Sequence, residues 1–170
     1  MESQHLGLLK RLINSRTEFT VIGGMAAVFY GSSILTQDLD VCAPLDERNI
    51  PRILDALRGV NPRFRMRPDR LPLPDQPERL HGFRNLYLST DIGIIDILDE
   101  VSGIGGFSEA LAQSRPAELM PGLTCQLLDL EALIAAKRAA GRPKDLRSVA
   151  ELLVILARKQ DDQNRGSLFK

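Results

Sequence analysis

The chain has 170 residues, a length typical of one domain or of one domain with a helical extension. Its apolar fraction is 44%, and its 22 basic residues balance 22 acidic ones, so net charge does not indicate a nucleic-acid partner. Two cysteines and two histidines are too few for a disulfide framework or a transition-metal site, and no apolar run reaches the roughly 20 residues that span a bilayer. We therefore expect a cytoplasmic protein with reduced thiols and no membrane partner.

The first third of the chain alternates apolar runs with turns and small residues. Apolar spacing predicts three helices and two strands, over residues 3–15 (helix), 19–22 (strand), 25–30 (helix), 39–43 (strand) and 47–58 (helix). The pair Gly23-Gly24 ends the first strand, where glycine lets the backbone approach a ligand. The helix start behind this pair offers free N–H groups to a phosphate.

Asp38 and Asp40 stand two residues apart at the second predicted strand. Residues i and i+2 of a strand point to the same side, so both carboxylates would meet at one point. Like charges held that close repel unless a cation lies between them, and a hard divalent ion prefers oxygen ligands. A solvated strand end is the alternative interpretation of this pair.

Residues 60–84 differ in composition from the rest of the chain. They contain five of the ten prolines and carry six arginines against three acids. We predict an irregular loop with a short strand at residues 64–66. This loop is either a lid, an acceptor-binding surface or a disordered insertion.

Two further strands are predicted over residues 84–89 and 94–98, and the second contains a single acid, Asp96, among four aliphatic residues. A lone acid is costly to bury unless it is paired or binds metal. If its strand lies beside that of Asp38 and Asp40, three carboxylates converge and can hold two Mg²⁺ ions. Asp96 would then also help to deprotonate an attacking hydroxyl.

The C-terminal third is predicted to contain a strand at residues 123–127, then helices at 130–140 and 146–159. Its helical hairpin contains a basic cluster that could neutralise a triphosphate or an RNA backbone, or could be a solvated helix end; it is formed by Lys137, Arg138, Arg142, Lys144 and Arg147. The resulting fold class is α/β (α+β), a mixed sheet flanked by helices with a C-terminal helical part. We expect an α/β core at 1–127, a helical hairpin packed on it at 128–159, and a flexible tail at 160–170.

The order apolar strand, Gly23-Gly24, thirteen residues, then Asp38-Leu39-Asp40 resembles the signature of the nucleotidyltransferase superfamily, which has a DNA polymerase beta-like fold. Residues 128–146 resemble the Lys…Arg-x-Lys-Asp segment of small bacterial nucleotidyltransferase-like proteins. These proteins include relatives of abortive-infection and toxin–antitoxin nucleotidyltransferases. Together with the strand around Asp96, the matches cover roughly residues 19–155.

This resemblance implies a Mg²⁺-dependent enzyme that transfers a nucleoside monophosphate from an NTP such as ATP to a hydroxyl acceptor. Asp38, Asp40 and Asp96 would be the catalytic residues and metal ligands of a two-metal site. The nucleotide-binding residues that it implies are Gly23, Gly24, Thr36, Lys137, Arg142, Lys144 and Asp145. The acceptor would be RNA or tRNA, a protein or a small molecule, and a toxin–antitoxin or phage-defence role with a cognate partner follows from the same resemblance.

Ile34 stands where relatives of this family often carry an arginine. This difference favours an alternative, in which the chain is a catalytically inactive binding module or an antitoxin-like partner. A third alternative is an enzyme that modifies a small molecule, for example by adenylylating an aminoglycoside. The sequence does not predict an oligomeric state.

Overall fold

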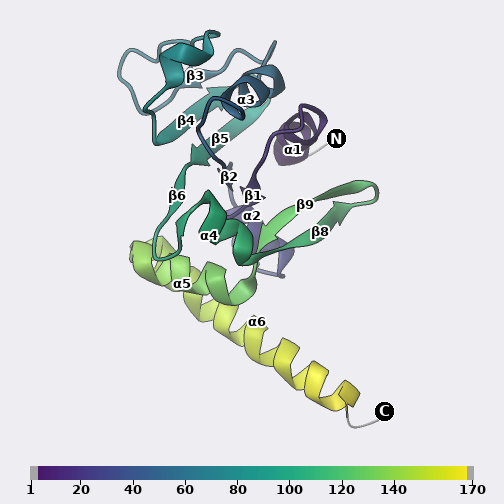
Figure 1. The fold of residues 1–170 in the computed structure, drawn as a ribbon. Coiled ribbons are helices and arrows are strands. Elements are labelled where there is room, and N and C mark those ends of the chain that lie inside the picture. The colour runs from purple at the N-terminus through teal and green to yellow at the C-terminus, as the bar shows by residue number, and fades with distance from the viewer. Residues whose placement is uncertain (1–3, 168–170) are drawn as a thin grey trace.

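The computed structural model describes residues 4–167, whose central element is a mixed sheet of seven strands (Figure 1). The strand order is β3-β4-β5-β2-β1-β9-β8. The strands of this sheet are β1 (Thr20–Val21), β2 (Asp38–Cys42), β3 (Arg63–Phe64), β4 (Asn85–Thr90), β5 (Gly93–Leu98), β8 (Ser114–Met120) and β9 (Leu123–Leu128). Strands β6 (Glu100–Val101) and β7 (Gly105–Gly106) form a separate small sheet. The predicted mixed sheet is therefore confirmed.

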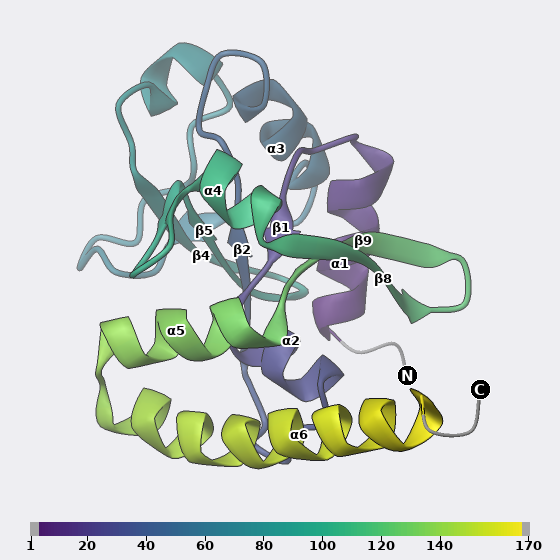
Figure 2. The same cartoon turned by 60° about the horizontal axis from the view of Figure 1, so that its bottom comes forward.

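Helices flank the sheet, as predicted. They are α1 (Gln4–Asn14), α2 (Gly23–Phe29), α3 (Ile50–Ala56), α4 (Phe107–Ala112), α5 (Leu130–Ala140) and α6 (Pro143–Ser167), with a 3₁₀ turn at Pro77–Leu80. Helix α1 packs on α3, β5 and β2, whereas α2 packs on β2 and α5. Helices α5 and α6 lie side by side as an antiparallel hairpin (Figure 2).

Alternation along β2 separates the core from the polar face of the sheet. Leu39 and Val41 are fully buried, as are Ile95 and Ile97 at the same positions of the neighbouring strand β5. Side chains at the intervening positions point to the opposite face, and there the sequence has acids. The apolar residues of β2 and β5 therefore fix the register that brings these acids together.

The structure differs from the predictions at several places. Helix α6 begins at Pro143 where residue 146 was predicted, and α3 begins at Ile50 where residue 47 was predicted. Helix α2 begins at Gly23, so the glycine pair lies within its first turn. Strand β8 lies in a stretch for which no strand was predicted, and it pairs with β9. Helix α6 continues past Lys159 to Ser167, so residues 160–167 are helical where a frayed tail was expected; residues 168–170 lie outside the described part.

The remaining expectations concern cysteines and membranes. Cys42 and Cys125 are both free and buried, in agreement with the prediction of reduced thiols. Within residues 4–167, no helix combines the length and apolar character that crossing a bilayer requires.

Candidate active site

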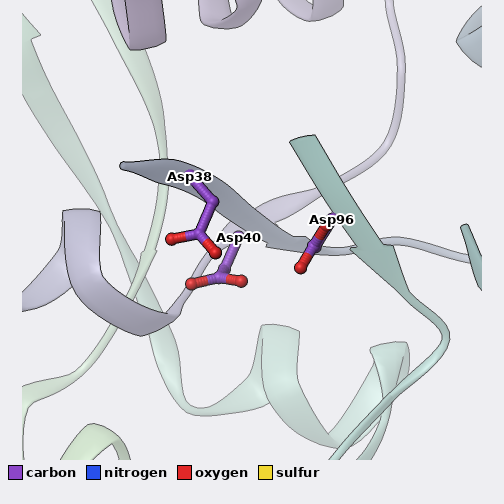
Figure 3. A group of neighbouring side chains, drawn as sticks. All are labelled: Asp38, Asp40 and Asp96. Carbon is purple, nitrogen blue, oxygen red and sulfur yellow. The ribbon is translucent and has the colours of Figure 1, made fainter. Parts of the chain in front are cut away.

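Three aspartates on two neighbouring strands converge on one face of the sheet (Figure 3). Asp38 and Asp40 lie on β2, and Asp96 is the direct neighbour of Asp40 on the parallel strand β5. One carboxylate oxygen from each residue lies within 4.8 Å of those of the other two. The predicted convergence is therefore confirmed, and we refer to these three side chains as the carboxylate cluster.

Arg65 supplies a positive charge to the carboxylate cluster, a role that the sequence analysis did not predict. Its Nε donates a hydrogen bond to Oδ1 of Asp96 at 3.1 Å, and its Nη2 donates to Oδ2 of the same carboxylate. The Nη2 atom also lies 4.0 Å from Oδ2 of Asp38. Because Asp96 is only 5% exposed, this two-pronged ion pair compensates the burial of its charge.

The carboxylate cluster carries unrelieved negative charge even with Arg65 present. Burial, together with the charges of Asp38 and Asp96, raises the pKa of Asp40 to about 7. The backbone N–H of Gly24 donates to Oδ2 of Asp40 at 3.4 Å and opposes this shift. Burial also raises the pKa of Asp96, against the opposing effect of its hydrogen bonds from Arg65. A divalent cation would relieve this repulsion.

The glycine pair is needed for the close approach of α2 to the carboxylate cluster. Gly23 has a φ of +63°, and a Cβ there would lie 2.1 Å from Oδ2 of Asp40. A Cβ on Gly24 would lie 2.5 Å from Oγ1 of Thr36. No side chain fits at either position without movement of its neighbours, so the first turn of α2 can lie directly against the acids.

The loop between α2 and β2 is fastened at both ends. Near its start, the backbone N–H and the hydroxyl of Ser33 donate to Oε1 of Glu151 on α6, at 2.7 and 2.8 Å, and the Ser32 hydroxyl donates to Oε2. Near its end, the Thr36 hydroxyl donates to Oδ1 of Asp38 at 2.9 Å. The loop therefore connects helix α6 to the carboxylate cluster.

A cavity of about 390 Å³ opens beside the carboxylate cluster, within the size range of small-molecule sites. Asp38 and Asp40 line it, whereas Asp96 does not. All the residues predicted to bind nucleotide line this cavity, namely Gly23, Gly24, Thr36, Lys137, Arg142, Lys144 and Asp145. Ile34, where an arginine was expected, also lines it, and this residue is 44% exposed.

The α5–α6 hairpin brings three cations to this cavity around one buried acid. Asp145 in the first turn of α6 is 3% exposed; Arg142 Nε donates to its Oδ2 at 2.6 Å, and Lys137 Nζ lies 3.9 Å from its Oδ1. Burial favours the protonated form of Asp145, but the hydrogen bond and charge of Arg142, with the charges of Lys137 and Lys144, hold its pKa below the ordinary value. Burial lowers the pKa of Lys137. We refer to these four residues as the cationic hairpin.

The sequence signals for the unpredicted residues were weak. Arg65 stands in the stretch where a short strand was predicted, and it is one of six arginines in residues 60–84 that could pair with the lone acid Asp96. Glu151 is one of several acids on a helix and lies 118 residues from Ser33, so no local pattern reveals their contact.

None of the known protein-family models matches this chain, and a search of curated proteins finds no match either.

Proposed function

We propose that the protein is a divalent-metal-dependent nucleotidyltransferase that transfers a nucleoside monophosphate from an NTP to a hydroxyl acceptor in the cytoplasm. One observation carries this proposal: a single cavity is lined by two members of the carboxylate cluster and by three cations of the hairpin. A magnesium–triphosphate complex has the complementary charges, with a cation at its phosphates and anionic oxygens around it. The resemblance of the Asp38-Leu39-Asp40 motif to nucleotidyltransferases supports the same chemistry.

The donor atoms of the carboxylate cluster fit Mg²⁺. All are carboxylate oxygens, which this hard cation prefers, and they meet within 4.8 Å of one another. The pKa of Asp40, raised to about 7, is further support, because a bound cation would favour its ionised form. When bound, Mg²⁺ neutralises charge on the phosphoryl oxygens during the transfer.

In this proposal, the cationic hairpin holds the triphosphate. The side chain of Lys137 is only 12% exposed, so its ammonium group is shielded from water. Asp145 keeps Lys137 and Arg142 in position. The acceptor hydroxyl has to reach Asp96, which does not line the nucleotide cavity. The acceptor therefore approaches from the side of β4 and β3. Its oxygen forms a bond to the α-phosphorus, the bond to pyrophosphate breaks, and the hydroxyl proton passes to Asp96.

Label transfer tests the proposal directly. The protein is incubated with each α-labelled NTP, Mg²⁺ and either total RNA or cell lysate, and labelled products are separated by size. We expect wild-type protein to label an acceptor and Asp40→Asn to label none. Asp69→Asn serves as the matched control, because Asp69 is an exposed carboxylate of the 60–84 loop. Absence of label transfer with every nucleotide would refute the proposed enzymatic activity.

The position of Ile34 supports a second candidate, a nucleotide-binding module without catalytic activity that acts as a partner or antitoxin-like protein. An aliphatic side chain lines the cavity where a cation would otherwise contact the triphosphate. Calorimetry with non-hydrolysable NTP analogues separates the two candidates, since tight binding without any label transfer would favour the module.

A further inference from the structure

The Arg65 guanidinium uses both carboxylate oxygens of Asp96, one of the three proposed metal ligands. We propose that Arg65 is a displaceable internal cation, which limits the resting site to one divalent ion on Asp38 and Asp40 and releases Asp96 for a second ion when its side chain moves away. This inference rests on the proposed function, because it needs the carboxylate cluster to be a metal site.

The sheet places Arg65 in line with the carboxylate cluster. Its backbone N–H donates to the carbonyl of Tyr87 at 2.9 Å, Tyr87 is the strand neighbour of Asp96, and Asp96 is the strand neighbour of Asp40. These four residues form one row, in which Arg65 directly follows β3 and the other three lie on β4, β5 and β2. Because the hydrogen bond to Tyr87 holds the backbone of Arg65, only its side chain has to move to release Asp96.

Tyr87 contacts the guanidinium of Arg65 while that guanidinium is paired with Asp96. The Cζ atom of Arg65 lies 5.7 Å from the centroid of the Tyr87 ring, within the range of a cation–π contact. The Arg65 side chain is 25% exposed, so it has a path towards solvent, whereas the Asp96 side chain is 7% exposed and cannot follow it. Rotation of a partly exposed side chain is fast compared with catalysis. Displacement therefore costs the Asp96 ion pair but leaves the sheet unchanged.

The Arg65 guanidinium and a divalent ion compete for Asp96 because both are cations. A divalent ion at Asp96 and a guanidinium on the same carboxylate repel each other and use the same acceptor oxygens. Replacing Arg65 by glutamine removes the competing charge and keeps a polar side chain of similar length. We expect tighter metal binding in this variant, by about tenfold or more, and we expect binding of two ions instead of one at low metal concentration.

Calorimetric titration with Mn²⁺ alone, at one pH and without nucleotide, tests the proposal on the full chain. The variants are Arg65→Gln, Arg65→Lys and the control Arg67→Gln, which removes an exposed charge of the same loop that stacks 5.0 Å above the Phe64 ring. Circular dichroism confirms folding. Arg65→Lys keeps the charge but not the paired hydrogen bonds; we expect it to bind several-fold tighter than wild type, so it tests the proposal if Arg65→Gln does not fold. Arg67→Gln should match wild type.

A second background shows where the competition occurs. In Asp96→Asn protein, Arg65→Gln should tighten Mn²⁺ binding far less, because the contested carboxylate is gone and only the 4.0 Å ion pair of Arg65 with Asp38 remains. The proposal is overturned if Arg65→Gln binds Mn²⁺ no tighter than wild type, if Arg67→Gln gives an equal gain, or if the full gain persists with Asp96→Asn.

Asp40→Asn separates failure of this proposal from failure of the proposed function. If Asp40→Asn abolishes Mn²⁺ binding and the Arg65 variants bind like wild type, only the displaceable cation is refuted. If no variant, including wild type, binds Mn²⁺, the metal site and the proposed function fail together.

Discussion

Two members of the carboxylate cluster line one cavity with the cationic hairpin, yet the two groups compensate buried charge in opposite ways. In the cluster three carboxylates surround one guanidinium, and the pKa values of Asp40 and Asp96 rise. In the hairpin three cations surround one carboxylate, and the pKa of Asp145 falls. Each group has more charges of one sign than of the other, and a stable fold does not require such an imbalance. The proposed metal–triphosphate ligand would offset both imbalances, because it brings a cation to one group and an anion to the other.

The first prediction separates activity from stability in the carboxylate cluster. Asp40→Asn should lower nucleotidyl transfer about 10³-fold, since it removes a proposed metal ligand. Without metal, the free energy of unfolding of the same variant should be about 1 kcal/mol higher than that of wild type, because the variant removes charge repulsion. Label transfer measures the first effect and urea denaturation measures the second. A variant that loses stability would contradict the account of the cluster as a repulsive site.

The pH dependence of this gain has a defined sign. The pKa of Asp40 is raised from 3.8 to about 7 in the folded protein, so ionised Asp40 disfavours folding. Metal-free wild type should therefore lose stability as pH rises through this window, and Asp40→Asn should lose less. Equal pH profiles of the two proteins would show that Asp40 does not titrate in this way.

The second prediction concerns the steric contact between α2 and the carboxylate cluster. Gly23→Ala should destabilise the protein by about 3 kcal/mol, because its φ is +63° and the new Cβ would lie 2.1 Å from Asp40 Oδ2. Gly122→Ala is the matched control, with a φ of +77° and nothing within 4 Å, and should cost about 1 kcal/mol. Denaturant melts of both variants measure the difference. Equal losses would mean that backbone conformation alone requires glycine at position 23.

The third prediction is the counterpart of the first in the cationic hairpin. Asp145→Asn should destabilise the protein by about 2 kcal/mol at neutral pH, since Lys137 and Arg142 lose a buried counter-charge. The folded-state pKa of Asp145 lies below its ordinary value, so its contribution is present above that value and disappears as pH falls through the folded-state pKa. Urea melts across acid pH should show the two proteins converging. A difference that persists below the folded-state pKa would contradict charge pairing as the cause.

The fourth and smallest effect concerns the loop that joins the two groups. Glu151→Gln weakens the charged acceptor of Ser32 and Ser33 on an exposed surface, so we expect little change in stability. NTP affinity should fall about threefold, because the loop that carries Ile34 and Thr36 becomes less ordered. Calorimetry with an NTP analogue measures this change. Glu131→Gln is a suitable control on the exposed face of α5 and should leave affinity unchanged.

Much of the fold was accessible from local patterns. The aliphatic run around Asp96, the Asp-x-Asp pair and the apolar spacing of residues 130–140 each predicted an element that the structure contains. Strand β8 was not predicted, because its residues alternate poorly and include Arg115, Pro116 and Glu118 at exposed positions. Among residues 4–167 it is an edge strand that pairs only with β9, so pairing instead of burial holds it in place.

The candidate site was predictable only in part, for a similar reason. In any strand, residues two positions apart point to the same side, so the sequence alone placed the carboxylates of Asp38 and Asp40 together. The partners of the acids depend on which strands are neighbours. Arg65 reaches Asp96 across an interval of 31 residues, and nothing local to either residue predicts that contact.

The sequence by itself determined the chemical inventory of this protein: a glycine pair before two acids, a lone acid in an aliphatic strand, and a basic segment near the C-terminus. Periodicity and residue type encode these features because they depend only on neighbours along the chain. The tertiary structure alone decided that β2 and β5 are adjacent and that the cationic hairpin shares their cavity. It also decided that Arg65 forms an ion pair with Asp96. These outcomes depend on packing between distant segments, which sequence spacing does not specify.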